Sequence, residues 1–343
     1  MYAASRGLLT LAALLVAASL VVASVAQAQP AAEFYRGKTI TLIVPADPGG
    51  SYDLHSRLIA RHIGKRIPGE PAVVVQNMTG AGGLRAINYL YEKAPQDGSV
   101  LGMPVQENTL ADVLGQSEAR YKAADFNWIG RMAPGVDVIA TWWTSGVRTI
   151  ADATRAAVPL GSTGPASGTS LFPLLLNNLA GTKFDIIPGY KHTEMLLAIE
   201  RGETYGAFTS LATLKTAYPT WIPNKRIHLL VAISPEPVAE LAGIPDLLSL
   251  AKNQTDRRVF SIFATASAVG RSLLTTPGVP AERVVALRNA FEAMTKDPEF
   301  IADVGKTKAE FGPMPGAALQ KLIVDSRDVP TQVLERARAA VRR

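Results

Sequence analysis

The sequence has no cysteine, so disulfide bonds and thiol chemistry are excluded. Histidine is scarce too, because the 343 residues include only His55, His62, His192 and His228. His55 and His62 fall on one predicted helix at i, i+7, where the helical rise places them about 10 Å apart, too far for one ion. The sequence therefore predicts no metal site, and we expect these two side chains to lie on a solvated helix face.

Motifs typical of catalysis and nucleotide binding are also missing. In residues 164–168 (GPASG) the serine stands one position too late for a G-x-S-x-G nucleophile elbow. Residues 80–85 (GAGGLR) begin like G-x-G-x-x-G, but Arg85 occupies the place of the third small residue. No P-loop is present. We therefore expect neither a bound cofactor nor an enzyme.

Long runs of one charge are absent. The formal net charge is +6, and the cations are scattered along the chain, so the sequence does not predict nucleic-acid binding. A mild positive charge suits an anionic small molecule. With 48% hydrophobic and 19% charged residues the composition is globular, and the chain is long enough for two domains.

Residues 1–28 have the pattern of a cleaved secretory signal peptide. Arg6 precedes an apolar run over residues 8–23, and residues 26–28 (AQA) form the small-x-small site that signal peptidase cuts. A membrane anchor is the alternative, but an apolar run of about 16 residues is short for a bilayer span. We expect an exported, monomeric mature chain.

The first strand–loop–helix unit predicts an anion site. Residues 39–44 read as a buried strand, the loop 45–50 (PADPGG) ends it, and a helix with Ile59, Ile63 and Ile67 on one face follows. The first turn of such a helix has free backbone N–H groups and attracts negative charge. Taken alone, this glycine loop is better explained as a simple strand-to-helix turn.

The next unit repeats the design, with a strand at 72–76, a glycine loop at 77–83 and a helix at 84–94. A third strand at 99–103 ends in the loop 104–108. Parallel strands joined by right-handed crossovers bring such loops to one edge of a sheet, where α/β sheets bind ligands. We therefore predict one pocket that includes Pro48, Gly49, Gly50, Ser51, Tyr52, Asp53, Thr79, Gly80, Ala81, Gly82, Gly83 and Gln106.

A second series of strands alternates with helices near residues 136–142, 157–161, 184–187, 204–209 and 226–233. The sequence thus predicts two doubly wound α/β lobes. Predicted lobe 1 takes residues 29–131 and 256–343, and predicted lobe 2 takes residues 132–255. The last helix, near 331–341, is expected on the surface of lobe 1.

The loop 161–170 of predicted lobe 2 is rich in hydroxyls and glycines, and it leads into a helix through 171–179 with Pro173 in the first turn. Hydroxyl groups and free amides can hold a carboxylate, although a flexible surface loop is an equal alternative. The ligand-binding residues that we predict in this lobe are Ser162, Thr163, Ser167, Gly168, Thr169 and Tyr190. Lys191 is expected to be a solvated charge.

Three ordered motifs resemble the extracytoplasmic solute receptors of the tripartite tricarboxylate transporter family (Bug/TctC-like). They are residues 38–40 (KTI) leading to 48–53 (PGGSYD), residues 73–77 (VVVQN) followed by 80–83 (GAGG), and residues 94–98 (APQDG). The resemblance implies a periplasmic binding protein of type II, a Venus flytrap that closes on a small carboxylate and signals to the membrane subunits of a transporter. It also implies that amides and ordered waters of the two lobe 1 glycine loops hold the proximal carboxylate.

The chain departs from the family pattern at the other end of the ligand. Thr79 replaces the usual proline, and Leu171 and Phe172 stand near the place where a histidine often follows Gly-Ser. Asp47 and Glu107, which we expect near the pocket mouth, could repel a second carboxylate or accept a hydroxyl or an amine. Citrate is therefore not the assumed ligand.

Two other functions fit parts of the pattern. One is an exported hydrolase of carboxylates or esters with Ser167 as nucleophile and Asp53 or Glu107 as base. The other is a ligand-sensing subunit that contacts a receptor kinase, which would share the fold.

Overall fold

The computed structural model describes residues 30–307 and 309–342. The predicted signal peptide, residues 1–28, lies outside these described residues. Within the same two ranges, no helix is both long and apolar enough to cross a membrane.

Lobe 1 is built on a six-stranded mixed sheet in the order β11-β4-β10-β3-β1-β2. The three strands predicted from the first units pair in parallel, and they are β1 (Thr39–Val44), β2 (Ala72–Asn77) and β3 (Val100–Gly102). Three further strands run antiparallel to their neighbours, and they are β4 (Asn127–Ala133), β10 (Arg271–Thr275) and β11 (Met314–Pro315).

Helices cover both faces of this sheet because alternate side chains of a strand point to opposite sides. From β1, Leu42 joins the cluster formed with α3, α11 and α12, whereas Ile43 joins the cluster formed with α4, α5 and α13. The helices of this part are α2 (Ala31–Tyr35), α3 (Ser51–Ile63), α4 (Leu84–Glu92), α5 (Asn108–Val113), α11 (Ala281–Thr295), α12 (Pro298–Thr307) and α13 (Gly316–Asp325).

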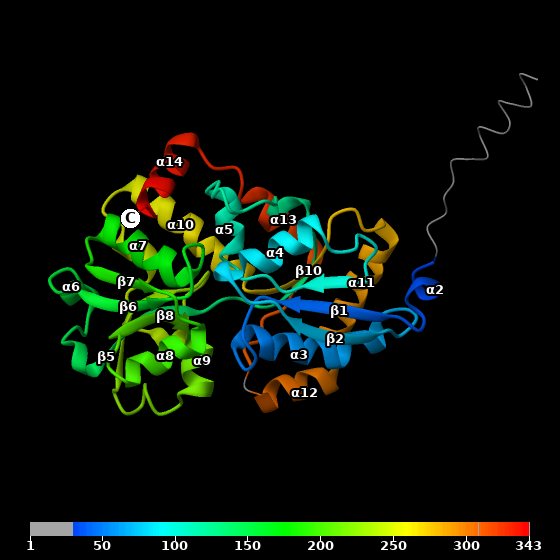
Figure 1. Ribbon diagram of the computed structural model, residues 1–343, viewed down its shortest axis with the longest axis horizontal. Coiled ribbons are helices and arrows are strands. Elements are labelled where there is room, and N and C mark those ends of the chain that lie inside the picture. The colour runs from blue at the N-terminus through cyan, green and yellow to red at the C-terminus, as the bar shows by residue number, and fades with distance from the viewer. Residues whose placement is uncertain (1–29, 308, 343) are drawn as a thin grey trace, which may run out of the picture.

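Lobe 2 is built on a five-stranded sheet in the order β7-β6-β8-β5-β9. β6 pairs in parallel with β7 and β8, whereas β5 runs antiparallel to β8 and β9. The two sheets lie side by side (Figure 1). The strands are β5 (Asp137–Trp142), β6 (Val158–Ser162), β7 (Phe184–Pro188), β8 (Gly206–Ser210) and β9 (Ile227–Ile233).

The helices of lobe 2 include two from the C-terminal part of the chain. These two are α10 (Gln254–Val269) and α14 (Thr331–Ala340). The other helices of lobe 2 are α6 (Ile150–Ala153), α7 (Gly168–Ala180), α8 (His192–Glu200) and α9 (Leu211–Ala217). Short 3₁₀ turns connect elements of both lobes, at η1 (Gly64–Arg66), η2 (Ala81–Gly83), η3 (Ala123–Asp125), η4 (Trp143–Ser145), η5 (Ala239–Leu241) and η6 (Leu247–Leu250).

The packing of α10 and α14 differs from the predicted lobe boundary, which placed both helices in lobe 1. Phe260 of α10 and Val333 of α14 are buried in one cluster with Phe172 of α7, and the three helices lie next to one another in Figure 1. The apolar sides of α10 and α14 pack against lobe 2. Because α10 then leads directly into β10 of lobe 1, this helix forms a second connection between the lobes.

Two local predictions are wrong. α7 begins at Gly168, so Pro173 lies inside the helix and beyond its first turn, because residues 168–170 of the hydroxyl-rich loop are already helical. His55 and His62 are 0% and 5% exposed, not solvated. The ring of His55 bridges the backbone carbonyls of Ser51 and Glu310, and His62 pairs with Asp303 at 2.9 Å.

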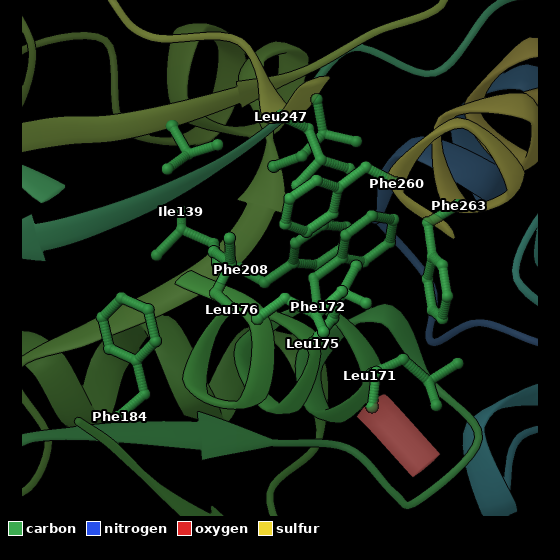
Figure 2. Packing of buried hydrophobic residues seen from close by; sticks show 14 of the residues in the cluster. Ile139, Leu171, Phe172, Leu175, Leu176, Phe184, Phe208, Leu247, Phe260 and Phe263 are labelled. Carbon is green, nitrogen blue, oxygen red and sulfur yellow. The ribbon is translucent and has the colours of Figure 1, made fainter. Parts of the chain in front are cut away.

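The core of lobe 2 is centred on four phenylalanines (Figure 2). The rings of Phe172 and Phe208 stack with centroids 4.7 Å apart, and Phe263 meets Phe172 edge to face at 5.8 Å. Phe260, from α10, completes the group. These rings join α7, β8 and α10, so the second connection between the lobes is held by aromatic packing.

We expect Phe172→Ala to lower the free energy of unfolding by about 3–5 kcal/mol, because it removes a fully buried ring and leaves a cavity. Urea denaturation measures the change. Leu197→Ala on α8 is the control, since its side chain is 42% exposed and surface changes usually stay within about 0.5 kcal/mol. Equal effects of the two substitutions would contradict the assigned role of the aromatic cluster.

Candidate functional site

A cavity of about 340 Å³ lies between the lobes. Lobe 1 contributes the loops after β1, β2 and β3 together with the first residue of β10, and lobe 2 contributes the loop before α7, the first turn of α8 and the end of β8. The predicted ligand residues that line it are Gly50, Ser51, Tyr52, Thr79, Gly80, Gly82, Gly83, Gln106, Thr163, Ser167, Gly168, Thr169 and Tyr190. Those outside its lining are Pro48, Gly49, Asp53, Ala81 and Ser162.

Asp53 supports the first glycine loop from behind. Its carboxylate accepts hydrogen bonds from the backbone N–H of Gly49 at 2.9 Å, from Arg57 at 2.9 Å and from Asn77 at 3.0 Å. The hydrogen bond from Arg57 holds the pKa of Asp53 below its ordinary value, against the opposing effect of burial. Asp53 therefore ties the loop after β1 to the end of β2.

The N-terminus of α3 opens toward the cavity at Ser51 and Tyr52. Its N-cap residue is Gly50, which has no side chain that could accept a hydrogen bond from the first turn. The free N–H groups and the positive end of the helix dipole favour an anion there.

The glycine loop after β2 touches the loop before α7 across the lobes. Gly82 has φ +64°, and a Cβ atom at this position would lie 2.9 Å from the backbone nitrogen of Ser167. In the opposite direction, a Cβ atom on Gly164 would lie 3.2 Å from the backbone nitrogen of Gly82. Both the left-handed backbone and the close approach require glycine at position 82, and the contact places the lobes in a closed arrangement.

The hydroxyl-rich loop is held by its own side chains. Thr169 Oγ1 accepts a hydrogen bond from the backbone N–H of Thr163 at 2.9 Å, and Ser162 Oγ lies 2.5 Å from Ser170 Oγ. Ser167 Oγ donates to the carbonyl of Gly164 at 2.7 Å. Within the described residues neither Asp53 nor Glu107 forms a hydrogen bond with Ser167, so the geometry does not favour the nucleophile hypothesis.

Arg271, a lining residue that sequence reasoning missed, supplies a buried positive charge. It is 2% exposed, its Nε donates to Ser51 Oγ at 3.2 Å, and its Nη1 donates to Gln106 Oε1 at 3.1 Å. The guanidinium lies 4.7 Å from the ring centroid of Tyr52. The sequence signal for Arg271 was an arginine at the start of an apolar strand. The side chain reaches the cavity only because β10 lies inside the lobe 1 sheet, which the sequence pattern does not show.

Two buried acids face the same cavity. Glu107 and Asp137 are each 3% exposed, and the side-chain nitrogen of Gln106 donates to Glu107 at 3.1 Å and to Asp137 at 2.6 Å. Burial and the neighbouring Asp137 raise the pKa of Glu107 to about 7, and burial also raises the pKa of Asp137. The sequence placed Glu107 near the mouth, but it is buried, and Asp137 was missed.

The rest of the lobe 2 wall was not predicted to bind a ligand, and Lys191 is exposed, as predicted for a solvated charge. This part of the wall consists of Lys191, His192, Thr193, Phe208, Thr209, Ser210 and Thr213. Burial lowers the pKa of His192 to about 4, so this imidazole is neutral at pH 7. Within the described residues no group of three or more potential metal ligands comes together.

The chain superposes on solved structures over most of its length. The periplasmic binding protein BugD superposes with a TM-score of 0.67 at 18% identity, over 89% of this chain and 98% of that protein. The Rhodopseudomonas palustris protein Rpa4515 with adipate gives 0.65 at 19% identity, over 88% and 97%. MatC from the same organism, with bound malate, gives a TM-score of 0.66 at 17% identity, over 89% of this chain and 99% of that protein.

No protein-family model and no curated protein sequence matches the chain. The similarity to these solved structures confirms the predicted two-lobe fold.

The raised pKa of Glu107 predicts a pH-dependent stability. A carboxyl group whose folded pKa is raised stabilises the protein fully below its unfolded pKa, and this contribution is lost as the pH rises through about 7. The groups that face Glu107 are Asp137, Gln106, Arg271 and Tyr52. Between pH 5 and pH 8 we expect Glu107→Gln to gain stability relative to the wild type by on the order of 2 kcal/mol.

Urea denaturation at several pH values measures this difference. Glu335→Gln on α14, where the side chain is exposed, is the control and should follow the wild type at every pH. A constant difference between Glu107→Gln and the wild type would contradict the assignment.

Proposed function

We propose that the protein is a periplasmic solute receptor that binds a small carboxylate between its lobes and delivers it to the membrane subunits of a tripartite tricarboxylate-type transporter. The observation that carries the proposal is the cavity between the lobes, with a helix N-terminus, a glycine loop and the buried Arg271 on one side. The receptor acts as a monomer without a cofactor, and it binds its ligand without chemical conversion.

The lobe 1 side of the cavity suits a carboxylate. The guanidinium of Arg271 donates its hydrogen bonds to the neutral groups of Ser51 and Gln106. It donates none to the nearby acids Glu107, Asp137 and Glu310, so N–H donors remain for an anion. Ser51 and Tyr52 of the first turn of α3 line the same cavity, and no side chain caps this turn. The neighbours Rpa4515 and MatC, which hold adipate and malate, support a carboxylate as the ligand class.

The lobe 2 side makes closure depend on the ligand. Thr163, Thr169 and Tyr190 reach the cavity from lobe 2. A solute that contacts both lobes only in the closed state shifts the hinge equilibrium toward that state. The closed surface is the form that a membrane subunit would recognise, and the predicted signal peptide, residues 1–28, agrees with a periplasmic location.

A thermal-shift screen of residues 29–343 tests the proposal. We expect stabilisation by small carboxylates, because a ligand at a hundred times its dissociation constant adds about 2.7 kcal/mol. Sugars and polyamines of similar size are the controls and should leave the melting temperature unchanged. A complete lack of response to mono-, di- and amino carboxylic acids would overturn the receptor proposal.

Gly82→Ala tests the closed contact. The added methyl group would lie 2.9 Å from the backbone nitrogen of Ser167, so we expect the affinity for a carboxylate found in the screen to fall at least about tenfold, roughly 1.4 kcal/mol. Calorimetric titration measures this loss.

Gly146→Ala is the matched control. Gly146 also has a positive φ, +74°, but no atom lies within 4 Å of its added Cβ. It therefore carries similar backbone strain without blocking closure. Equal affinities of the two variants would show that the contact between the glycine loops does not govern binding.

A further inference from the structure

The charges that line the cavity do not match a dicarboxylate. Three carboxyl groups, those of Asp47, Glu107 and Asp137, face it, and Arg271 is the buried cation. The side chain of Lys191 is 65% exposed, and its amine lies 3.4 Å from a carboxylate oxygen of Glu194. If one carboxylate of a dicarboxylate bound to Arg271, its other carboxylate would therefore lie near the carboxyl groups of the cavity and be repelled.

Gln106 separates the positive end of the cavity from the negative end. Its carbonyl oxygen accepts a hydrogen bond from Arg271, and its amide nitrogen donates to both Glu107 and Asp137. The amide is thus fixed in one orientation, since a flipped amide would direct N–H groups at the guanidinium. The positive charge of Arg271 and the negative charges of Glu107 and Asp137 are therefore separated by a single amide group.

The two acids have acceptor capacity that the protein does not fill. A carboxylate can accept about four hydrogen bonds. The described residues offer Asp137 only the Gln106 amide, and they offer Glu107 that amide and its own backbone N–H. The nearby charge of Arg271 favours the ionised form of both acids, but its guanidinium donates a hydrogen bond to neither of them. Buried carboxylates with so few donors are costly. An ammonium group brings both a positive charge and three donors.

We infer that the solute is a zwitterionic amino acid whose carboxylate binds at Arg271 and α3 and whose ammonium group binds between Glu107 and Asp137. This inference rests on the proposed receptor function and specifies its ligand. Val105 and Phe208 line the same cavity and give its side chain an apolar wall, whereas Asp47 at the rim disfavours a second carboxylate. The ligand is accordingly an amino acid with an uncharged side chain.

Matched pairs of ligands test the inference on the wild-type protein by calorimetric titration. Each pair differs only in the amino group: alanine and propionate, leucine and 4-methylpentanoate, phenylalanine and 3-phenylpropionate. For the pair whose side chain fits, we expect the amino acid to bind at least tenfold more tightly than the acid that lacks the amine.

The outcomes separate this inference from the proposed function. If the plain acid binds as tightly as the amino acid, or if dicarboxylates alone bind, the inference is overturned and the carboxylate receptor stands. If neither amino acids nor other carboxylates bind, the proposed function itself fails. Both decisions come from the wild type, so they do not depend on the folding of a variant.

Isosteric variants then locate the ammonium site. In Glu107→Gln and in Asp137→Asn we expect the ratio of the two affinities to fall toward one, because each variant removes one of the two negative charges that select the amine while the shape is kept. Asp185→Asn is the control, since this exposed residue of β7 lies outside the cavity lining, and it should keep the wild-type ratio. An unchanged ratio in both cavity variants would overturn the assigned ammonium site.

Discussion

A buried chain of hydrogen bonds from Arg271 through Gln106 to Asp137 joins the two lobes. Its members come from β10, from the loop after β3 and from the first residue of β5. A buried guanidinium and a buried carboxylate are costly unless each has partners, and one amide serves both. The same chain gives the cavity a positive and a negative end, so stability and ligand preference depend on the same groups.

The glycines of the two loops set how closely the lobes can approach. Gly82 and Gly164 leave no room for a side chain between the β2–α4 loop and the loop before α7. Without Cβ atoms, backbone amides and hydroxyls of both loops can come near a small ligand. Glycine therefore has two roles in this fold, in the left-handed turn of lobe 1 and in the contact between the lobes.

Much of the fold could be predicted because it depends on local patterns. The apolar run at residues 39–44 is β1, and the glycine loop at 77–83 separates β2 from α4 as expected. Parallel pairing of β1, β2 and β3 then brings their loops to one edge. The predicted pocket residues of these loops could be named for this reason, although Pro48 and Gly49 of the first loop lie outside the cavity lining.

Other features depend on partners distant in the sequence. The apolar side of α14 shows that the helix packs on something, but only the tertiary structure places it against α7 and α10. In the same way, the helical pattern around His55 and His62 contains no information about the carbonyl of Glu310 or about Asp303, the distant partners of these two buried rings.

The sequence by itself determined the two α/β lobes, the glycine loops and the start of α3 behind the first of these loops, because hydrophobic period and turn chemistry act over a few residues. Only the tertiary structure decided that Gln106, Asp137 and Arg271 meet. These residues lie on separate elements. Asp137 and Arg271 are the first residues of β5 and β10, which directly follow the β4–β5 and α10–β10 connections between the lobes. The charge pattern of the cavity is therefore a property of the assembled lobes.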